Sequence, residues 1–526
     1  MSYNNLLVTL LTSLIFTSKS IAQIQIKIYP DSTVNQMAAG FGCNTYAMLD
    51  SVPVVYDAQH NYRSWGGSAW GAMPEATDQK AWAKIFTYMD WLGIDYTRLN
   101  LEHRMFQPEK GKLSFDNREM QVLYKQLDYF EKKGVIVQLQ EMYPNAKWLA
   151  HKELQSTSVG IIKSGPADLE AWSDGIVALL RHLTQVKRYT CIKYFGIANE
   201  PHHSWSWWKA PDGQTSQSII PALDLLKKKL VKAKLNIPLT GPEEMFYHWE
   251  VKASQRNYSS YVDAFTYHEY MTILDWWDSN NGKDWYPTLK SFSEPVKTAV
   301  GIAHSQKKPF FFSEHGTMHF GLNKDDRGPS KFDAVFKDVE FGMRYSNLGV
   351  DGFSRWSLLN RGNLDGQWGF IETFDRSTLK MLDPEKYTPK ENTFYGYGLL
   401  TRFTYKNSYV VKSTIQTSGN DSISHLFTTT FLSPSKRDAS IYIINDKQLN
   451  STVDINLDMN TLKYKTWYKY EFTIDDRNKT DVKISPKEEL QSKKLSTVIK
   501  GMTITVYSTL KLNHDDAGLV TEMATK

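Results

Sequence analysis

The chain has 526 residues, more than one hydrophobic core usually serves, so we expect one large domain with a smaller companion. A hydrophobic fraction of 41% and a charged fraction of 23% fit a soluble globular protein. The formal net charge of +5 is small for this length and no concentrated basic tract occurs, which argues against nucleic acid as a partner.

The first residues have the features of an export signal. An apolar stretch runs from Leu6 to Phe16, and the small residues of Ser20-Ile21-Ala22 suit cleavage by a signal peptidase, although no Lys or Arg precedes the stretch. This stretch is too short to cross a bilayer, and no later segment is long enough. We expect residues 1–22 to be a signal peptide and the protein to be secreted or periplasmic, with no membrane span. A buried N-terminal helix is the alternative.

Residues 38–400 predict a parallel sheet wrapped by helices, because short apolar segments alternate with amphipathic ones. The segments that we expect to be strands are 39–46, 94–101, 135–142, 192–199, 237–242, 262–270, 309–316 and 350–358. Eight strand–helix repeats indicate closure into a (β/α)₈ barrel, the α/β fold known as the TIM barrel.

The segments between these strands have helical periodicity. In residues 117–134, the side chains of Met120, Leu123, Leu127 and Phe130 share one face, and Gly134 is a plausible helix stop. Comparable patterns occupy 78–92, 168–186, 217–234, 293–307 and 330–347. The fifth repeat offers only a short helix within 245–261.

The character of the sequence changes after about residue 402, where helical periodicity is lost. The segments that follow are short, rich in β-branched residues and separated by polar turns: 408–417, 423–431, 439–446, 451–459, 465–474 and 501–512. They predict an antiparallel β-sandwich, to which the alternating segment 24–30 adds a strand. The expected parts are an N-terminal strand (23–37), the barrel (38–400), the sandwich (401–512) and a frayed tail (513–526).

Chemistry is expected at the ends of the barrel strands, because the active sites of TIM barrels lie at the carboxyl-terminal face. The polar and aromatic residues at these ends are Arg98, Asn100, Glu141, Tyr143, Asn199, Glu200, His268, Tyr270, Glu314, His315 and Trp356. Glu200 and Glu314 end the apolar segments FGIANE and PFFFSE. A buried carboxylate is costly unless it is paired, which disfavours a purely structural use of both; two solvated loop carboxylates are the alternative. A pair of carboxyl groups can cleave a glycosidic bond.

The barrel resembles the clan A glycoside hydrolases in five elements. These are Arg98 in TRLN on strand two, Asn199-Glu200-Pro201 on strand four, His268 and Tyr270 in TYHEY on strand six, Glu314 in FFFSEHG on strand seven and Trp356 on strand eight. The match covers about residues 38–360, and its specificity comes from the strand order, because Asn-Glu-Pro alone is a weak motif. The opening GFG and the added sandwich are similar to the layout of glycoside hydrolase family 30.

The resemblance implies a catalytic pair. Glu200 would be the acid/base and Glu314 the nucleophile, with Arg98 bonded to Glu314 and Asn199 binding the sugar 2-hydroxyl. Members of the clan retain the anomeric configuration, which requires the two carboxyl groups to be about 5–5.5 Å apart. Because Arg98 favours the charged form of its neighbour, Glu314 is expected to be a carboxylate while Glu200 holds its proton.

The resemblance also implies substrate-binding residues, among which we include Arg98, Asn199, His268 and Tyr270. His268 or Tyr270 would orient the nucleophile, and Trp356 would form the floor under the sugar. Flat indoles suit the apolar face of a sugar ring, and tryptophans cluster after strands one, four and six: Trp65, Trp70, Trp205, Trp207, Trp208, Trp276, Trp277 and Trp285. We expect Trp205, Trp207 and Trp276 to bind substrate. Core packing is the alternative for each.

Other residues near the strand ends compete for these roles. Glu141, Glu243, Glu244 and Glu269 are acidic, but none has both the flanking motif and the strand position of the catalytic pair. The nearby histidines are His202, His203, His315 and His319, and no HExxH or comparable ligand spacing occurs among them. We expect no metal and no cofactor.

The two cysteines, Cys43 and Cys191, suggest a disulfide in an exported chain. However, Cys43 falls near the carboxyl-terminal end of strand one, whereas Cys191 precedes the end of strand four by eight residues, or about 26 Å at roughly 3.3 Å per residue. We therefore expect two free, buried thiols.

The resemblance finally implies a retaining O-glycosyl hydrolase that acts on a β-linked oligo- or polysaccharide, and the expected signal peptide adds that it is exported. The tryptophan-rich loops favour endo action. An exo-acting β-glycosidase on short oligosaccharides and a non-catalytic carbohydrate-binding barrel are the alternatives. The sugar, the linkage and the oligomeric state stay open.

Overall fold

The computed structural model describes residues 24–515 apart from internal gaps. These gaps are 50–54, 57–61, 64–72, 203–206, 247–250, 272–288, 318–330, 360–368, 376–379, 390, 418–424, 447–452, 459–461, 463, 477–478, 480–481 and 492–493. The expected signal peptide, 1–22, and most of the expected tail, 513–526, lie outside the described residues. Among the described helices, none is long and apolar enough to cross a membrane.

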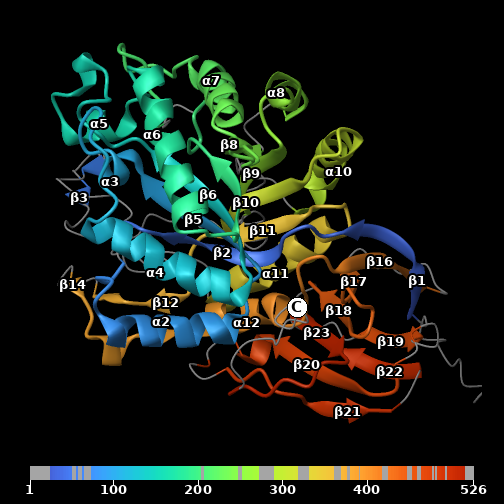
Figure 1. Ribbon diagram of the computed structural model, residues 1–526. Coiled ribbons are helices and arrows are strands. Elements are labelled where there is room, and N and C mark those ends of the chain that lie inside the picture. The colour runs from blue at the N-terminus through green and yellow to red at the C-terminus, as the bar shows by residue number, and fades with distance from the viewer. Residues whose placement is uncertain are drawn as a thin grey trace, which may run out of the picture.

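Eight parallel strands form the barrel that the sequence predicts (Figure 1). In chain order they are β2 (Gly40–Tyr46), β5 (Tyr96–Glu102), β6 (Ile136–Tyr143), β7 (Ile192–Gly196), β8 (Thr240–Met245), β9 (Ala264–Met271), β10 (Phe310–Thr317) and β11 (Gly352–Arg355). They are hydrogen-bonded in the order β7-β6-β5-β2-β11-β10-β9-β8. A parallel bridge between Phe195 and Leu239 joins the two outer strands, so the barrel nearly closes at this seam.

Helices cover the outside of the barrel (Figure 1). The longer ones are α2 (Gln79–Leu92), α4 (Arg118–Lys133), α6 (Leu169–Arg181), α7 (Ile219–Lys232), α8 (Val251–Tyr258), α10 (Leu289–Ser305), α11 (Lys331–Ser346) and α12 (Glu391–Thr401). In α4, the Asn117 side chain accepts a hydrogen bond from the Met120 N–H, and Gly134 ends the helix in left-handed backbone with φ 66°. These end signals are local, which is why the sequence predicts the bounds of α4 well.

Short elements fill the connections. They are α3 (His103–Phe106), α5 (Ser158–Lys163), a π-helical turn (His182–Val186), 3₁₀ turns (Lys152–Leu154, Pro384–Lys386, Ile474–Asp476) and the strand pairs β3 (Val55–Tyr56) with β4 (Tyr62–Arg63), β12 (Ile371–Glu372) with β15 (Thr388–Pro389) and β13 (Phe374–Asp375) with β14 (Lys380–Met381). The helix α3 follows β5 directly and therefore lies at the carboxyl-terminal face of the barrel.

The interior of the barrel changes from apolar to polar along its axis. Near the amino-terminal ends of the strands, the Phe311 ring packs against Tyr96 and Tyr194, with ring centroids 5.5 and 5.2 Å away. The neighbours of Phe311 in β10 alternate with it and pack on the other face, Phe310 against Tyr267 of β9 and Phe312 against Tyr345 of α11. Further along, the buried inward side chains are polar: Arg98, Gln138, Thr240 and Glu243. The run PFFFSE is thus a strand packed on both faces, and it brings Glu314 to the polar end.

The second sheet has nine strands in the order β21-β20-β23-β18-β17-β16-β1-β19-β22. They are β1 (Ile24–Gln36), β16 (Tyr409–Thr417), β17 (Leu426–Leu432), β18 (Ala439–Asn445), β19 (Val453–Asp458), β20 (Trp467–Thr473), β21 (Glu488–Leu490), β22 (Lys494–Ile499) and β23 (Thr503–Ser508). Figure 1 shows the N-terminal β1, in blue, lying against the orange β16.

Alternation along β1 explains its place in the second sheet. Ile24, Ile26 and Ile28 are buried, and β1 pairs antiparallel with β16 and parallel with β19. These isoleucines share one apolar core with Ile441 and Trp467, which lie on strands far from β1 in the order. The sheet therefore folds over on itself, and the predicted β-sandwich is confirmed.

Both cysteines are free and buried, as the sequence predicts. Burial raises the pKa of the Cys43 thiol to about 12, although the charge of Arg355 opposes the rise. Both thiols are therefore protonated at neutral pH, since burial also raises the pKa of Cys191.

Replacing Gly42 by alanine is expected to destabilise the barrel by roughly 3 kcal/mol or more. A Cβ atom at Gly42 would lie 1.6 Å from the carbonyl oxygen of Tyr96 in the adjacent strand, so β2 and β5 would have to separate. Urea unfolding measures the loss. The matched control is Gly301→Ala in α10, where nothing lies within 4 Å of the new atom and a gain of about 0.5–1 kcal/mol is expected. Equal stability of the two variants would contradict the strand packing described here.

Candidate active site

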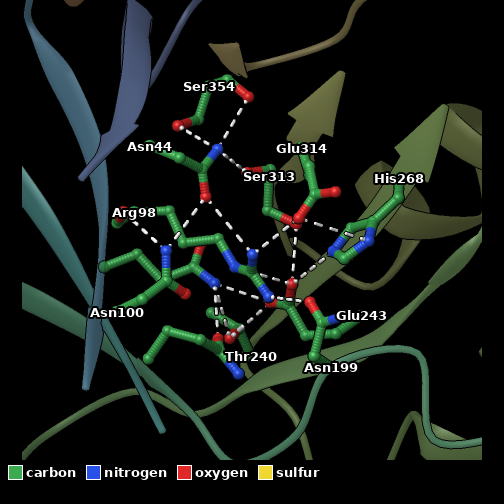
Figure 2. A network of polar contacts seen from close by, with 12 residues as sticks. Asn44, Arg98, Asn100, Asn199, Thr240, Glu243, His268, Ser313, Glu314 and Ser354 are labelled. Atoms are coloured by element: carbon green, nitrogen blue, oxygen red, sulfur yellow. Dashed lines mark hydrogen bonds and ion pairs between the residues drawn. The ribbon is translucent and has the colours of Figure 1, made fainter. Parts of the chain in front are cut away.

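Arg98 occupies the centre of the polar end of the barrel (Figure 2). Its Nη1 donates to Glu314 Oε2 at 2.9 Å and its Nη2 to Asn199 Oδ1 at 2.8 Å. Its Nε lies 3.3 Å from Glu243 Oε2. Because a guanidinium stays protonated in proteins, one fixed positive charge ties the ends of three strands together.

Asn44 and Asn100 hold Arg98 from β2 and β5. Asn44 Oδ1 accepts hydrogen bonds from Arg98 Nη1 at 3.2 Å and from Asn100 Nδ2 at 3.3 Å. The amide of Asn44 donates to the carbonyl oxygens of Ser313 and Ser354 (Figure 2). The sequence analysis named Asn100 only as a strand-end residue and overlooked Asn44. The signal for Asn44 was a polar residue inside the apolar strand GFGCNTY.

Glu314 receives hydrogen bonds at both carboxyl oxygens. Arg98 donates to Oε2 at 2.9 Å, and the Tyr270 hydroxyl donates to Oε1 at 2.5 Å. The pKa of Tyr270 is raised well above its usual value by burial and by the charge of Glu314, so the phenol keeps its proton as a donor. These contacts fix the orientation of the Glu314 carboxyl group.

Glu200 follows β7 in a left-handed backbone conformation, with φ 46°. For a residue other than glycine this conformation costs on the order of 1 kcal/mol and is held only where surrounding contacts require it. Here the Glu200 N–H donates to the carbonyl oxygen of Glu243 at 2.8 Å, and His268 Nδ1 lies 2.8 Å from Glu200 Oε1. The backbone turn thus presents the Glu200 carboxyl group to the end of β9.

The carboxyl groups of Glu200 and Glu314 lie close together. One oxygen of each, with one ring nitrogen of His268, forms a group whose atoms are all within 4.8 Å of one another. Burial raises the pKa of Glu314 and the charge of Glu200 adds to the rise, whereas His268, Arg98 and the Tyr270 hydrogen bond oppose it. The net direction is upward. Two carboxyl groups this close titrate as a coupled pair, which retains one proton to a higher pH than two isolated glutamates would.

His268 is a buried cation between the acidic groups. Its Nδ1 faces Glu200, and its Nε2 lies 3.1 Å from Glu243 Oε2. Burial alone would lower the pKa of the imidazole, but the charge of Glu314 and the hydrogen bonds with Glu200 and Glu243 raise it to about 10. At neutral pH both ring nitrogens therefore act as donors.

Glu243 is not a member of the carboxyl pair. From the sequence it was an alternative candidate for a catalytic role, but in the structure it is buried behind Glu200 and Glu314, against Arg98 and His268. Glu244, the next residue, accepts a hydrogen bond from the His202 N–H. The sequence TGPEEM offered both acids at the end of a strand. The sequence could not show which of the two acids would contact Arg98 and His268, because these two side chains come from other strands.

Solvent exposure divides the site into two layers. Glu200, Asn199, Tyr270 and Glu314 keep 8, 6, 6 and 5% of their surface exposed, whereas Arg98 and His268 keep none. The exposed layer can touch a ligand. Arg98 and His268, which we expected among the substrate-binding residues, lie behind the layer that a ligand can reach.

The structure places some of the aromatic candidates at the strand ends and others in the core. Trp356 directly follows β11, is 3% exposed and packs edge-on against Tyr46. Trp207 is half-buried and stacks on Tyr143 at the end of β6, with ring centroids 5.0 Å apart. Trp208 is wholly buried against Trp172, so it packs in the core. The candidates Trp205 and Trp276 lie outside the described residues.

The competing acids and histidines have structural partners. Glu141 lies 2.7 Å from His103 Nδ1 and accepts from the Trp172 indole N–H at 2.7 Å. Glu269 accepts from the Tyr270 N–H at 3.1 Å. His315 stacks on Phe341, and His202 contacts the Tyr258 hydroxyl. His203 and His319 lie outside the described residues.

Glu200, His268 and Glu314 form the one group among the described residues with the spacing of metal ligands. Two carboxylates and an imidazole are a donor set that could hold a divalent cation. However, Arg98 and protonated His268 already supply positive charge there, so a metal ion would have to displace the imidazole proton. The absence of a metal remains a prediction.

No protein-family model and no curated protein sequence matches the chain. Solved structures do match over nearly their whole length. A glycoside hydrolase family 30 subfamily 8 xylanase from Clostridium acetobutylicum is 11% identical, with 92% of this chain and 99% of that chain covered and a TM-score of 0.54. An α-L-arabinofuranosidase of glycoside hydrolase family 51 from Thermotoga petrophila RKU-1 is 12% identical, with coverages of 93% and 100% and a TM-score of 0.60.

A monomeric β-xylosidase from Caulobacter crescentus CB15 is also similar, at 13% identity, with coverages of 92% and 99% and a TM-score of 0.57. At these identities the likeness is one of fold. It confirms the TIM barrel with a β-sandwich and the predicted resemblance to the layout of clan A glycoside hydrolases, family 30 included.

Proposed function

We propose that the protein is a retaining glycoside hydrolase that cleaves β-glycosidic bonds of an oligo- or polysaccharide by double displacement. The observation that carries the proposal is the approach of Glu200 and Glu314, which have carboxyl oxygens within 4.8 Å of each other. Retaining enzymes place these groups about 5–5.5 Å apart, whereas inverting enzymes leave about 6.5–9.5 Å for a water molecule. The observed spacing supports direct attack by one carboxylate.

In the first step, a Glu314 oxygen attacks the anomeric carbon while Glu200 gives its proton to the departing glycosidic oxygen. The sugar is then held as an ester on Glu314, and Glu200 is a carboxylate. In the second step, Glu200 takes a proton from water, the water oxygen attacks the anomeric carbon, and Glu314 leaves as a carboxylate. Each step inverts the carbon, so the configuration is retained overall.

Charge balance leaves one proton for Glu200 and Glu314 to share. Two cations, Arg98 and His268, face three carboxyl groups, Glu200, Glu243 and Glu314, so two carboxylates and one carboxylic acid leave the site neutral. Glu243 is an anion because Arg98 and His268 outweigh burial and lower its pKa to about 2. Glu314 accepts hydrogen bonds at both oxygens. We place the remaining proton of the coupled pair on Glu200, as its acid role requires, because a proton on Glu314 would oppose the donors Arg98 and Tyr270.

The matched structures support a carbohydrate substrate, since they include a xylanase, an α-L-arabinofuranosidase and a β-xylosidase. Asn199 is partly exposed beside the pair and would bind the sugar 2-hydroxyl, with Trp356 beneath the ring. We also propose export, from the N-terminal sequence, and endo action, from the tryptophan-rich loops. Exo action on short oligosaccharides is the alternative.

A screen against β-glucans, galactans, mannans and xylans tests the proposal. Hydrolysis of one of them is the expected result, and the sizes of the products over time separate endo from exo action. Binding of a glycan without any hydrolysis would contradict the proposal and favour a non-catalytic carbohydrate-binding barrel.

Replacing Tyr270 by phenylalanine is expected to move the acidic limb of the kcat/KM profile to higher pH. The hydroxyl donates to Glu314 and lowers the pKa of that carboxyl. Without it, the nucleophile becomes protonated at a higher pH, by about one unit. The control Tyr124→Phe removes a hydroxyl that donates to the Phe115 carbonyl oxygen in another part of the fold, and its profile is expected to match the unaltered protein. Coincident profiles for all three proteins would contradict the role of Tyr270.

A further inference from the structure

Two adjacent glutamates of β8, Glu243 and Glu244, are both buried but have opposite electrostatic surroundings. Burial raises the pKa of either carboxyl group. For Glu243, Arg98 and His268 outweigh burial and lower the pKa to about 2. For Glu244, burial dominates and the charge of Glu200 adds to it, so its pKa is well above the ordinary value. Glu243 is therefore an anion at neutral pH, whereas burial disfavours the charged form of its neighbour Glu244.

The contacts of Glu243 suit an anion. Four described side chains donate to its carboxylate: Gln138 Nε2 at 2.6 Å and Thr240 Oγ1 at 3.2 Å to Oε1, with Ser313 Oγ at 2.8 Å and His268 Nε2 at 3.1 Å to Oε2. Arg98 adds an ion pair, with its Nε 3.3 Å from Oε2. A carboxylate is an acceptor only, whereas a protonated carboxyl would set an O–H against these donors. The pocket around Glu243 is therefore built for a negative charge.

One side chain connects Glu243 to each carboxyl group of the proposed catalytic pair. His268 links it to Glu200, at 3.1 and 2.8 Å, and Arg98 links it to Glu314, at 3.3 and 2.9 Å. Its backbone carbonyl also accepts the Glu200 N–H at 2.8 Å. Because Glu243 is only 1% exposed, it acts through these neighbours rather than on a ligand.

We propose that Glu243 is a positioning residue for the proposed glycosidase reaction: its fixed negative charge keeps His268 an imidazolium and Arg98 in place, so that the pair retains one proton, on Glu200. The inference rests on the proposed function. The titratable and charged groups around Glu243 are Tyr96 and Arg98 of β5, Glu200 after β7, Glu244 of β8, His268 and Tyr270 of β9 and Glu314 of β10.

Removing the charge of Glu243 leaves two cations facing two carboxyl groups. The site then binds its protons less tightly, and the state with both Glu200 and His268 protonated is lost at a lower pH. Glu243→Gln is therefore expected to move the alkaline limb of kcat/KM down by about one pH unit or more. Turnover at the original optimum falls by about 10²-fold, with KM changed by less than about threefold, since Glu243 touches no ligand.

Glu244→Gln is the matched control, because it replaces an equally buried neighbour whose charged form is disfavoured by burial and which forms no ion pair with Arg98 or His268 among the described contacts. Its alkaline limb is expected to stay within about 0.3 pH units. Glu243→Asp keeps the negative charge, so the alkaline limb of its kcat/KM profile is expected to stay at the pH of the unaltered enzyme. The proposal is overturned if the Glu243→Gln profile coincides with that of the unaltered enzyme, or if Glu244→Gln shifts it equally.

A measurement on the unaltered chain covers the case in which Glu243→Gln does not fold. Nitrogen-15 spectra of histidine-labelled protein report the protonation of each imidazole, and His268 is assigned by the signal lost in His268→Gln. We expect His268 to be doubly protonated at pH 8; a neutral His268 at pH 7 would overturn the inference. This readout needs no turnover, so it fails or succeeds independently of whether any glycan is hydrolysed.

Discussion

Glu314→Ala is expected to lower kcat by about 10⁴-fold or more while glycan binding survives. The variant has no carboxylate to form the ester, yet Asn199 and Trp356, which would contact the sugar, are unchanged. Turnover is measured on the glycan that the unaltered protein cleaves best, and binding is measured by titration calorimetry. Unchanged turnover would contradict the nucleophile assignment.

Azide distinguishes loss of the nucleophile from loss of the fold. The anion can occupy the space that the Glu314 side chain leaves and attack the anomeric carbon in its place. One inversion then takes place instead of two, so the expected product is the α-glycosyl azide. The control Glu314→Gln fills the same space and should not be rescued. A β-glycosyl azide would contradict direct attack from the Glu314 side.

Glu200→Ala is expected to discriminate between leaving groups. A natural glycoside needs a proton on its departing oxygen, so its kcat/KM should fall by about 10³-fold. An aryl glycoside with an acidic phenol leaves without that proton and should lose much less in the first step. The measurement compares kcat/KM for the natural substrate with that for a dinitrophenyl β-glycoside of the same sugar.

Equal losses on both substrates would count against the acid role of Glu200. The matched control is Glu141→Gln, which alters a buried acid of β6 whose described partners are His103 and Trp172. Its two substrates should be affected alike, because Glu141 contacts neither member of the proposed pair. The ratio of the two losses, rather than either loss alone, therefore identifies the acid.

The barrel was predictable because its signals are local. The alternation of Phe310, Phe311 and Phe312 requires a strand with two packed faces, and the cap at Asn117 and the stop at Gly134 set the bounds of α4. Strand order then places the ends of β7 and β10 on one face of the barrel. For this reason Glu200 and Glu314 could be named together before their distance was known.

The contacts within the site were not predictable in the same way. Glu243 and Glu244 are neighbours in sequence and equally buried, yet only one meets Arg98 and His268, which come from other strands. Asn44 is equally dependent on distant partners, since it joins β2 to β10 and β11. Trp207 and Trp208 are also neighbours in sequence, yet Trp207 stacks on Tyr143 and Trp208 packs against Trp172 in the core. Such outcomes depend on long-range packing, which a pattern along the chain does not contain.

The anomeric form of the first product tests the central claim most directly. Proton NMR recorded in the first minutes of hydrolysis, before mutarotation, shows which anomer the enzyme releases. Carboxyl oxygens within 4.8 Å of each other are closer than the roughly 6.5–9.5 Å by which inverting enzymes separate their two carboxyl groups, so the β anomer is expected first. Release of the α anomer first would mean single displacement by water and would contradict the assignment of Glu200 and Glu314 as a retaining pair.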